Sequence, residues 1–121
     1  MKRIVLFWHN KMSHPIRGVK NGLLHDFSIS YMVCTGIVGL ILLYLFFGPF
    51  SALEQLLLIF CFFLMVMMEF VNSAFEAALD RLHPEKHGEI GYSKDLIAAA
   101  SFCAQLFSLI CIGYVLSGTL S

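Results

Sequence analysis

The sequence predicts an all-α membrane protein in which an N-terminal amphipathic surface helix is followed by three transmembrane helices. Hydrophobic residues make up 59% of the 121 positions and charged residues only 13%, far from the roughly 25% charged residues of a soluble domain. Three apolar runs approach the ~20 residues that an α-helix needs to cross a bilayer. One domain over residues 1–121 has room for three spans but not for a separate soluble nucleotide-binding domain.

The segment before the first apolar run mixes basic and apolar residues. Residues 13–27 read SHPIRGVKNGLLHDF, a composition typical of a helix that lies in the membrane surface. Pro15 is expected in the first turn of this helix, where proline is tolerated. Lys11 and Arg17 interrupt the stretch in which a signal peptide would need its apolar core, so we expect the N-terminal segment to be retained.

Breakers and polar residues delimit the three predicted spans, which cover about residues 29–48, 53–80 and 95–116. Gly48-Pro49 ends the first apolar run with two strong helix breakers. The second run is apolar from Leu53 to Met68 and needs the polar residues that follow to reach a spanning length. The third begins near the small residues Ala98 to Ser101, which allow neighbouring helices to approach closely. Residues 80–95 are expected to form a short hydrophilic loop.

The charged residues predict the orientation of the spans. Eight basic and eight acidic residues give a net charge of zero, so nothing indicates a nucleic-acid partner. The basic residues precede the first span or lie between the second and third, at Lys2, Arg3, Lys11, Arg17, Lys20, Arg81, Lys86 and Lys94. By the positive-inside rule, the N-terminus and the loop 80–95 are expected on the cytoplasmic side and the C-terminus on the far side.

A polar row, formed by Glu69, Asn72, Glu76 and Asp80, continues the second span. At 100° per residue these side chains project from an arc of about 80° on one helix face. A charged side chain at membrane depth costs at least ~2.5–3.5 kcal/mol, and neighbouring carboxylates repel one another unless a cation or a proton intervenes. Because hard oxygen ligands suit magnesium rather than zinc, the polar row indicates a metal–phosphate site. The alternative, a polar helix end that emerges into the cytoplasm, explains Asp80 and Glu76 well but Glu69 poorly.

Lys94 and Asp95 stand where the hydrophilic loop re-enters the membrane. A lysine at this place can neutralise phosphate charge beside another carboxylate. A lysine at the membrane interface, followed by an aspartate that N-caps the third span, is an equally good interpretation on local grounds. Only the combination with the polar row favours phosphate binding.

Other residue types that bind metals give weaker signals. Histidines and glutamates alternate in the loop at His83, Glu85, His87 and Glu89. A helical His-x3-His pair can chelate a metal, but Pro84 and Gly88 disfavour a regular helix there, so a transition-metal site is not expected. The four cysteines lie in apolar runs without CxxC spacing, which indicates neither a disulfide framework nor a zinc site.

The polar row and the loop after it carry a family resemblance. Residues 69–80 follow the pattern E-x-x-N-S-A-x-E-x-x-x-D, and the positions that extend it are Glu85, His87, Gly91, Lys94 and Asp95. This arrangement resembles the prokaryotic diacylglycerol kinase and undecaprenol kinase family over essentially the whole chain. The resemblance implies a homotrimeric lipid kinase of the bacterial cytoplasmic (inner) membrane, with magnesium as cofactor, ATP as phosphate donor and a membrane lipid alcohol as acceptor.

The resemblance also implies a role for each site residue. Glu69 is similar to the family's general base toward the lipid hydroxyl, and Asn72 to its contact with the transferred phosphate. Glu76 corresponds to a magnesium ligand, and Asp26 stands where the family has a glutamate that joins the magnesium site from the surface helix. The positions that correspond to nucleotide-binding residues are Glu76, Glu85, His87, Lys94 and Asp95.

Four positions depart from the family pattern. Asp26 keeps the charge of the family's glutamate but has a shorter reach. Ser30 stands where members often carry arginine, and Phe75 and Leu79 stand where they prefer β-branched residues. The last three departures do not touch the chemistry directly.

Three functions are compatible with these observations. We expect phosphorylation of diacylglycerol to phosphatidic acid, because Asp80-Arg81 and the loop 85–91 resemble that branch of the family. The nearest alternative is the same reaction on undecaprenol, which also presents a primary hydroxyl on a long apolar body. A remote alternative is a non-enzymatic subunit or a small ion-conducting oligomer in which Glu69 and Glu76 line a polar path, although the other two spans supply no ionisable partner at mid-depth.

Overall fold

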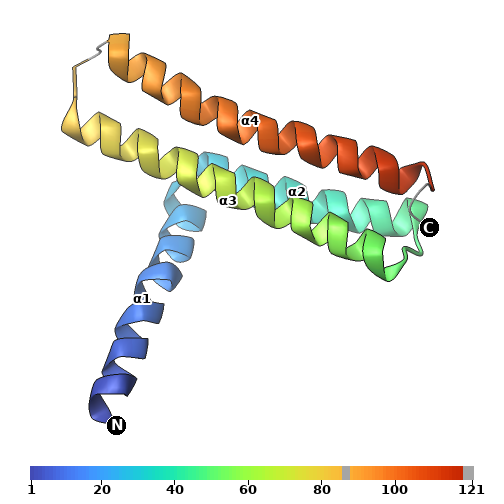
Figure 1. Cartoon of the computed structure of the whole chain (residues 1–121), viewed down its shortest axis with the longest axis horizontal. Coiled ribbons are helices and arrows are strands. Elements are labelled where there is room, and N and C mark those ends of the chain that lie inside the picture. The colour runs from blue at the N-terminus through green and yellow to red at the C-terminus, as the bar shows by residue number, and fades with distance from the viewer. Residues whose placement is uncertain (86–87, 119–121) are drawn as a thin grey trace.

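The computed structural model shows an all-helical chain whose described part comprises residues 1–85 and 88–118. Within these residues it has four α-helices, which are α1 (Lys2–His25), α2 (Phe27–Phe47), α3 (Ala52–Leu82) and α4 (Gly88–Leu116). Helices α2, α3 and α4 run side by side, and α1 projects away from them at a steep angle (Figure 1). The most extensive packing joins α3 to α4, followed by α2 to α3 and then α1 to α2.

Three of the helices are long and apolar enough to cross a membrane, which confirms the predicted number of such helices. Helices α2, α3 and α4 contain 21, 31 and 29 residues, against the ~20 that a spanning helix needs. Most of their large apolar side chains are exposed in the single chain. Exposure of this kind suits helices surrounded by lipid tails or by other subunits, because hydrocarbon solvates apolar side chains as well as a protein core does.

The first helix differs from its prediction at its start. It begins at Lys2 rather than near residue 13, and Pro15 lies inside it rather than in its first turn. Residues 2–12 contain neither glycine nor proline, so nothing in them stops the helix. Proline removes the N–H that would bond to the carbonyl of Lys11, but Lys11 is exposed, so that carbonyl can bond to solvent instead. The location of α1 on a membrane surface stays a prediction.

The connection between α3 and α4 is shorter than the predicted loop 80–95. Helix α3 continues to Leu82 and α4 begins at Gly88, so the helix that carries the third predicted span starts seven residues before residue 95. Glu89 lies in the first turn of α4, where a carboxylate stabilises the helix dipole, and Ser93 Oγ donates to the Glu89 carbonyl at 3.1 Å. The predicted break at Pro84 is confirmed, because this residue is not helical.

A capping box starts α3 at the opposite end of the bundle from that connection. The backbone N–H of Glu54 donates to Ser51 Oγ at 3.2 Å, and the backbone N–H of Ser51 donates to Glu54 Oε2 at 2.8 Å. This pair satisfies two N–H groups that a helix start leaves without partners. It also explains a second buried carboxylate on α3, since Glu54 is only 3% exposed.

Small residues on one face of α4 set its distance from α3. The buried residues of α4 are Ser101, Ala104, Ser108 and Val115, and those of α3 are Glu54, Leu58, Cys61 and Glu69. Both sets recur at spacings of three and four or sums of these, as expected for one face of a helix. Small side chains let two helix backbones approach closely in a membrane. The approach places residues near 101 of α4 opposite residues near 69 of α3.

A glycine of α2 makes a similar close approach to α3. A Cβ atom added to Gly36 would lie 2.6 Å from Phe62 Cε2 and 2.7 Å from Phe62 Cδ2. Gly39, one turn further along α2, has no atom within 4 Å of such a Cβ. The absence of a side chain is therefore required at Gly36 and not at Gly39.

This difference predicts opposite effects of the same substitution. Gly36→Ala should lower the free energy of unfolding by about 1–3 kcal/mol, because the added methyl group overpacks the contact with Phe62. Gly39→Ala should leave it unchanged or raise it by up to about 1 kcal/mol through its higher helix propensity. Reversible unfolding of both variants in mixed detergent micelles measures the difference. Equal stability of the two variants would contradict this account of the α2–α3 contact.

Candidate functional site

The polar row lies on the C-terminal half of α3, and its members differ in burial. Glu69 is only 8% exposed and Asn72 is half-buried, whereas Glu76 and Asp80 are exposed. Emergence of the helix from the membrane explains the two exposed carboxylates. It does not explain Glu69, which α4 covers. Glu69 is therefore the residue of the row whose position calls for a function.

A serine on α4 bonds to the buried carboxylate of Glu69. Ser101 Oγ donates to Glu69 Oε2 at 3.1 Å, and Ser101 is only 5% exposed. Among residues 1–85 and 88–118, no group bonds to the other oxygen, Oε1. From the sequence, Ser101 is predicted only to allow close packing of neighbouring helices. This bond depends on the register between α3 and α4, which the pattern within either helix does not contain.

Asn72 carries an unsatisfied acceptor close to this pair. Its Oδ1 atom is buried, and nothing in the described part of the chain donates to it. A buried polar atom without a partner costs about 1–3 kcal/mol, and such atoms are rare in folded proteins. Asn72 lies one helical turn from Glu69 on the same face of α3. The two residues together mark a place where a bound molecule with a hydrogen-bond donor would be stabilised.

An ion pair joins the ends of α3 and α4 beyond Asn72. Lys94 Nζ on α4 contacts Asp80 Oδ1 on α3, with Lys94 half-buried and Asp80 exposed. An exposed pair of this kind adds at most about 1 kcal/mol to stability. It nevertheless holds the ammonium group of Lys94 at the Asp80 end of the polar row. Asp95 lies inside α4, which begins at Gly88. The alternative interpretation of Asp95 as the N-cap of the third span is therefore wrong.

Asp26 forms the junction between α1 and α2. Its Oδ1 accepts a hydrogen bond from the backbone N–H of Ile29 at 3.2 Å, which makes it the N-cap of α2. Ser30, at the position where the family often has arginine, donates to the carbonyl oxygens of Leu23 at 2.6 Å and Asp26 at 3.0 Å. The junction is thus fixed by local bonds, and the Asp26 carboxylate already has a structural role.

The described residues do not bring three metal-binding side chains together. In the parts of the chain with assigned positions, no group of three or more His, Cys, Asp and Glu side chains can hold a metal ion. Magnesium, however, often binds through only one or two carboxylates together with water and substrate phosphates. The exposed carboxylate of Glu76 and the half-buried one of Asp26 fit that donor chemistry. Their joint role stays a prediction.

The remaining predicted nucleotide-binding residues lie in the connection between α3 and α4. Glu85 is exposed there. His87 lies outside the described residues. The structure therefore places Glu85 on the same side of the bundle as Lys94 and Asp80, without a contact between them.

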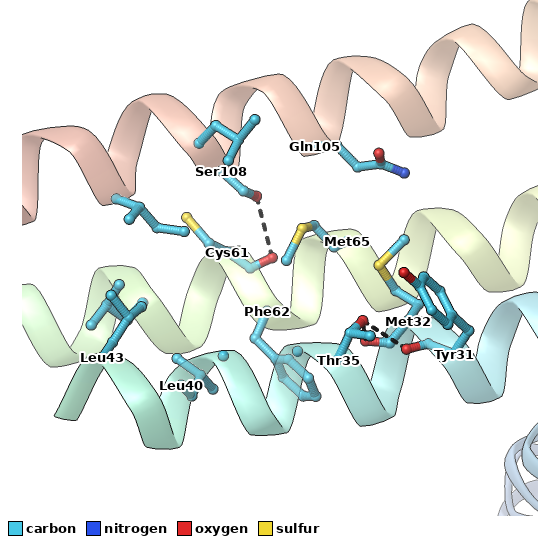
Figure 2. Close-up of a pocket in the computed structure, with 15 residues that line it drawn as sticks. Tyr31, Met32, Thr35, Leu40, Leu43, Cys61, Phe62, Met65, Gln105 and Ser108 are labelled. Atoms are coloured by element: carbon cyan, nitrogen blue, oxygen red, sulfur yellow. Dashed lines mark hydrogen bonds between the residues drawn. The ribbon is translucent and has the colours of Figure 1, made fainter. Parts of the chain in front are cut away.

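An apolar groove of about 340 Å³ lies between α2, α3 and α4 (Figure 2). None of the predicted site residues lines it. Met65 and Gln105 do, and each lies four residues, about 6 Å along a helix, from Glu69 and Ser101 respectively. The groove thus ends about one helical turn from the carboxylate of Glu69. It could not be seen in the sequence, because its space arises where three helices meet.

A family model described as prokaryotic diacylglycerol kinase matches residues 13–116. The match contains every predicted site residue from Asp26 to Asp95. A comparison with curated proteins gives no significant match.

The junction at Asp26 generates a prediction that separates its cap from any other role. Asp26→Ala should lower the free energy of unfolding by about 1 kcal/mol, because α2 loses its N-cap. Asp26→Asn should retain most of the stability, since asparagine caps as well as aspartate. Unfolding of the two variants in detergent micelles measures both effects. Equal losses for alanine and asparagine would show that the charge, and not the cap, stabilises the junction.

Proposed function

Because the chain belongs to the prokaryotic diacylglycerol kinase family, we propose that it phosphorylates diacylglycerol to phosphatidic acid with ATP. The family match covers most of the chain and makes it a lipid kinase, and the three apolar helices make it a multi-pass membrane protein. One observation carries the finer proposal. A carboxylate buried between two apolar helices, that of Glu69, is held by Ser101 beside the unsatisfied Oδ1 of Asn72.

In the proposed mechanism, Glu69 acts as the general base. The primary hydroxyl of the lipid gives its proton to Glu69 Oε1, and its oxygen forms a bond to the γ-phosphorus of ATP. The bond between that phosphorus and the β–γ bridging oxygen breaks, so that ADP leaves. A base within hydrogen-bond reach of the hydroxyl typically contributes 10²–10⁴-fold to the rate. The free Oε1 atom supports this assignment, because a base needs an unoccupied oxygen.

The other residues of the site position the phosphates and neutralise their charge. Phosphoryl transfer depends mainly on these two effects. The Nδ2 group of Asn72 donates to the transferred phosphate, and Lys94 exchanges its bond with Asp80 for one to the nucleotide. Glu76 and Asp26 hold magnesium, which supplies positive charge beside the phosphates when it is bound. The nucleotide itself contacts Glu76, Glu85, His87, Lys94 and Asp95.

The proposal includes a homotrimer with active sites shared between subunits. A single chain exposes most of its large apolar side chains and its described residues assemble no set of three metal ligands. Both observations support contributions from a second subunit. In this arrangement α1 lies on the cytoplasmic surface as an amphipathic helix, the α3–α4 connection is also cytoplasmic, and the C-terminus is on the far side of the bacterial inner membrane.

The acceptor is proposed from its chemistry. The apolar groove ends one turn from Glu69, which supports an acceptor with a hydrocarbon body and a terminal hydroxyl. Diacylglycerol and undecaprenol both meet this description. We propose diacylglycerol on the resemblance of Asp80-Arg81 and residues 85–91 to that branch, with undecaprenol as the alternative.

The role of Glu69 predicts a selective loss of activity. Glu69→Gln should lower kcat by about 10²–10⁴-fold, because glutamine keeps the size of glutamate and can still accept the bond from Ser101 but cannot take up a proton at the amide. The matched control is Glu54→Gln, which changes the other buried carboxylate of α3, and should leave kcat unchanged. Transfer of labelled phosphate from ATP to lipid measures both. Full activity of Glu69→Gln would refute its role as the base.

The choice of acceptor is tested by supplying both lipids to the purified protein. Labelled phosphate should pass from ATP to diacylglycerol faster than to undecaprenol in detergent micelles, and chelation of magnesium should abolish both reactions. Faster turnover of undecaprenol would identify the protein as an undecaprenol kinase. Transfer to neither lipid, with magnesium present, would contradict the proposed reaction.

A further inference from the structure

We propose that Ser101 is a positioning residue for Glu69. Its hydroxyl fixes the Oε2 atom of the carboxylate, and Oε1 is thereby left to take the proton of the lipid hydroxyl. This inference rests on the proposed function of Glu69 and adds a residue on a different helix. The family resemblance implied no role for Ser101, and the sequence predicted only that its small side chain allows close helix packing.

The burial of both partners makes this bond significant. Glu69 and Ser101 are 8% and 5% exposed, and their bond of 3.1 Å crosses from α3 to α4. A buried carboxyl group must find a hydrogen-bond partner, because its transfer from water is otherwise unfavourable. Within the described parts of the chain, Ser101 is the one donor to this carboxylate. Its removal would leave Glu69 buried and unpaired.

The bond also restricts a rotation that matters for a base. The terminal torsion of a glutamate is broad, so a carboxylate without partners samples many orientations. A general base must present one oxygen to the proton that it removes, within hydrogen-bond reach. A donor fixed on a neighbouring helix selects one orientation of the carboxylate plane. Ser101 supplies that donor from the tightly packed face of α4.

A second serine on the same face shows that packing alone does not explain Ser101. Ser108 lies seven residues further along α4 and is equally buried. Its Oγ bonds to backbone carbonyls only, that of Ala104 within its own helix at 2.9 Å and that of Cys61 on α3 at 3.5 Å. Among the described residues, Ser101 bonds to no backbone carbonyl. Its hydroxyl bonds instead to an ionisable side chain, the carboxylate of Glu69.

The unpaired Oδ1 atom of Asn72 indicates that a hydrogen-bond donor binds beside Glu69. Glu69 Oε1 and Asn72 Oδ1 are acceptors that lie one turn apart on the same face of α3, and neither has a donor in the described chain. A primary alcohol that enters from the membrane brings one O–H group to this place. The orientation that Ser101 imposes keeps Oε1 available to it.

The test compares four variants of the full-length protein in detergent micelles. Ser101→Ala and Ser101→Cys should both lower kcat by roughly 10- to 100-fold, because a hydrogen bond to a charged group is lost or weakened, while KM for the lipid stays unchanged. Cysteine fills nearly the same space as serine but is a weak donor, so it controls for an unfilled volume. Ser101→Thr keeps the hydroxyl and should retain most of kcat. Glu69→Gln is the fourth variant and reports on the proposed base itself.

Each other outcome decides against the proposal. Wild-type kcat in Ser101→Ala or Ser101→Cys would show that Glu69 needs no such donor. No recovery of kcat in a folded Ser101→Thr would assign Ser101 to packing. Glu69→Gln, measured in the same assay, separates the two hypotheses. If Glu69→Gln is inactive and Ser101→Ala is fully active, only the positioning role fails, whereas an active Glu69→Gln removes the proposed base itself.

Discussion

A carboxylate buried between two apolar helices is the constraint on which the rest of the structure depends. An ionisable group at the depth of Glu69 costs at least ~2.5–3.5 kcal/mol, and this cost must be offset where α3 meets α4. The offset comes from an interface of small side chains, which brings Ser101 within 3.1 Å of the carboxylate. A larger residue at position 101 or 104 would separate the helices and leave Glu69 without its donor. The composition of α4 is therefore tied to the chemistry of α3.

A close contact beside Glu69 also places α1 relative to α3. A Cβ on Gly22 would lie 2.6 Å from Phe70 Cε1, so α1 can approach α3 only because this position has no side chain. Phe70 directly follows Glu69 in the chain. The contact ties α1 to the part of α3 that carries Glu69, in addition to the local hydrogen bonds that fix the α1–α2 junction at Asp26.

The sequence predicted most features that depend on a single helix, but it did not predict those that depend on the contact between two helices. Composition and periodicity were sufficient for the three apolar helices, the break at Pro84 and the shared face of the polar row. The starts of α1 and α4 were misjudged, because Pro15 and the loop glycines suggested boundaries where the helices continue. The bond from Ser101 to Glu69 had no signal in either helix, since it is fixed by their relative register. The capping box at Glu54 was present in the pattern Ser51-x-x-Glu54 and was overlooked.

The single chain positions the proposed base more completely than the proposed nucleotide-binding residues. Glu69 has its hydrogen-bond donor within the chain, whereas Lys94 is paired with Asp80 and Asp26 is engaged as a helix cap. Those nucleotide-binding candidates that the structure describes are thus exposed or already bonded, whereas the carboxylate proposed to act on the lipid is buried and held by a hydrogen bond. This division fits the physical difference between the two substrates. A lipid must be recognised at membrane depth, where an unpaired polar group is costly, while a nucleotide arrives from water and can compete for exposed ion pairs that contribute little to stability.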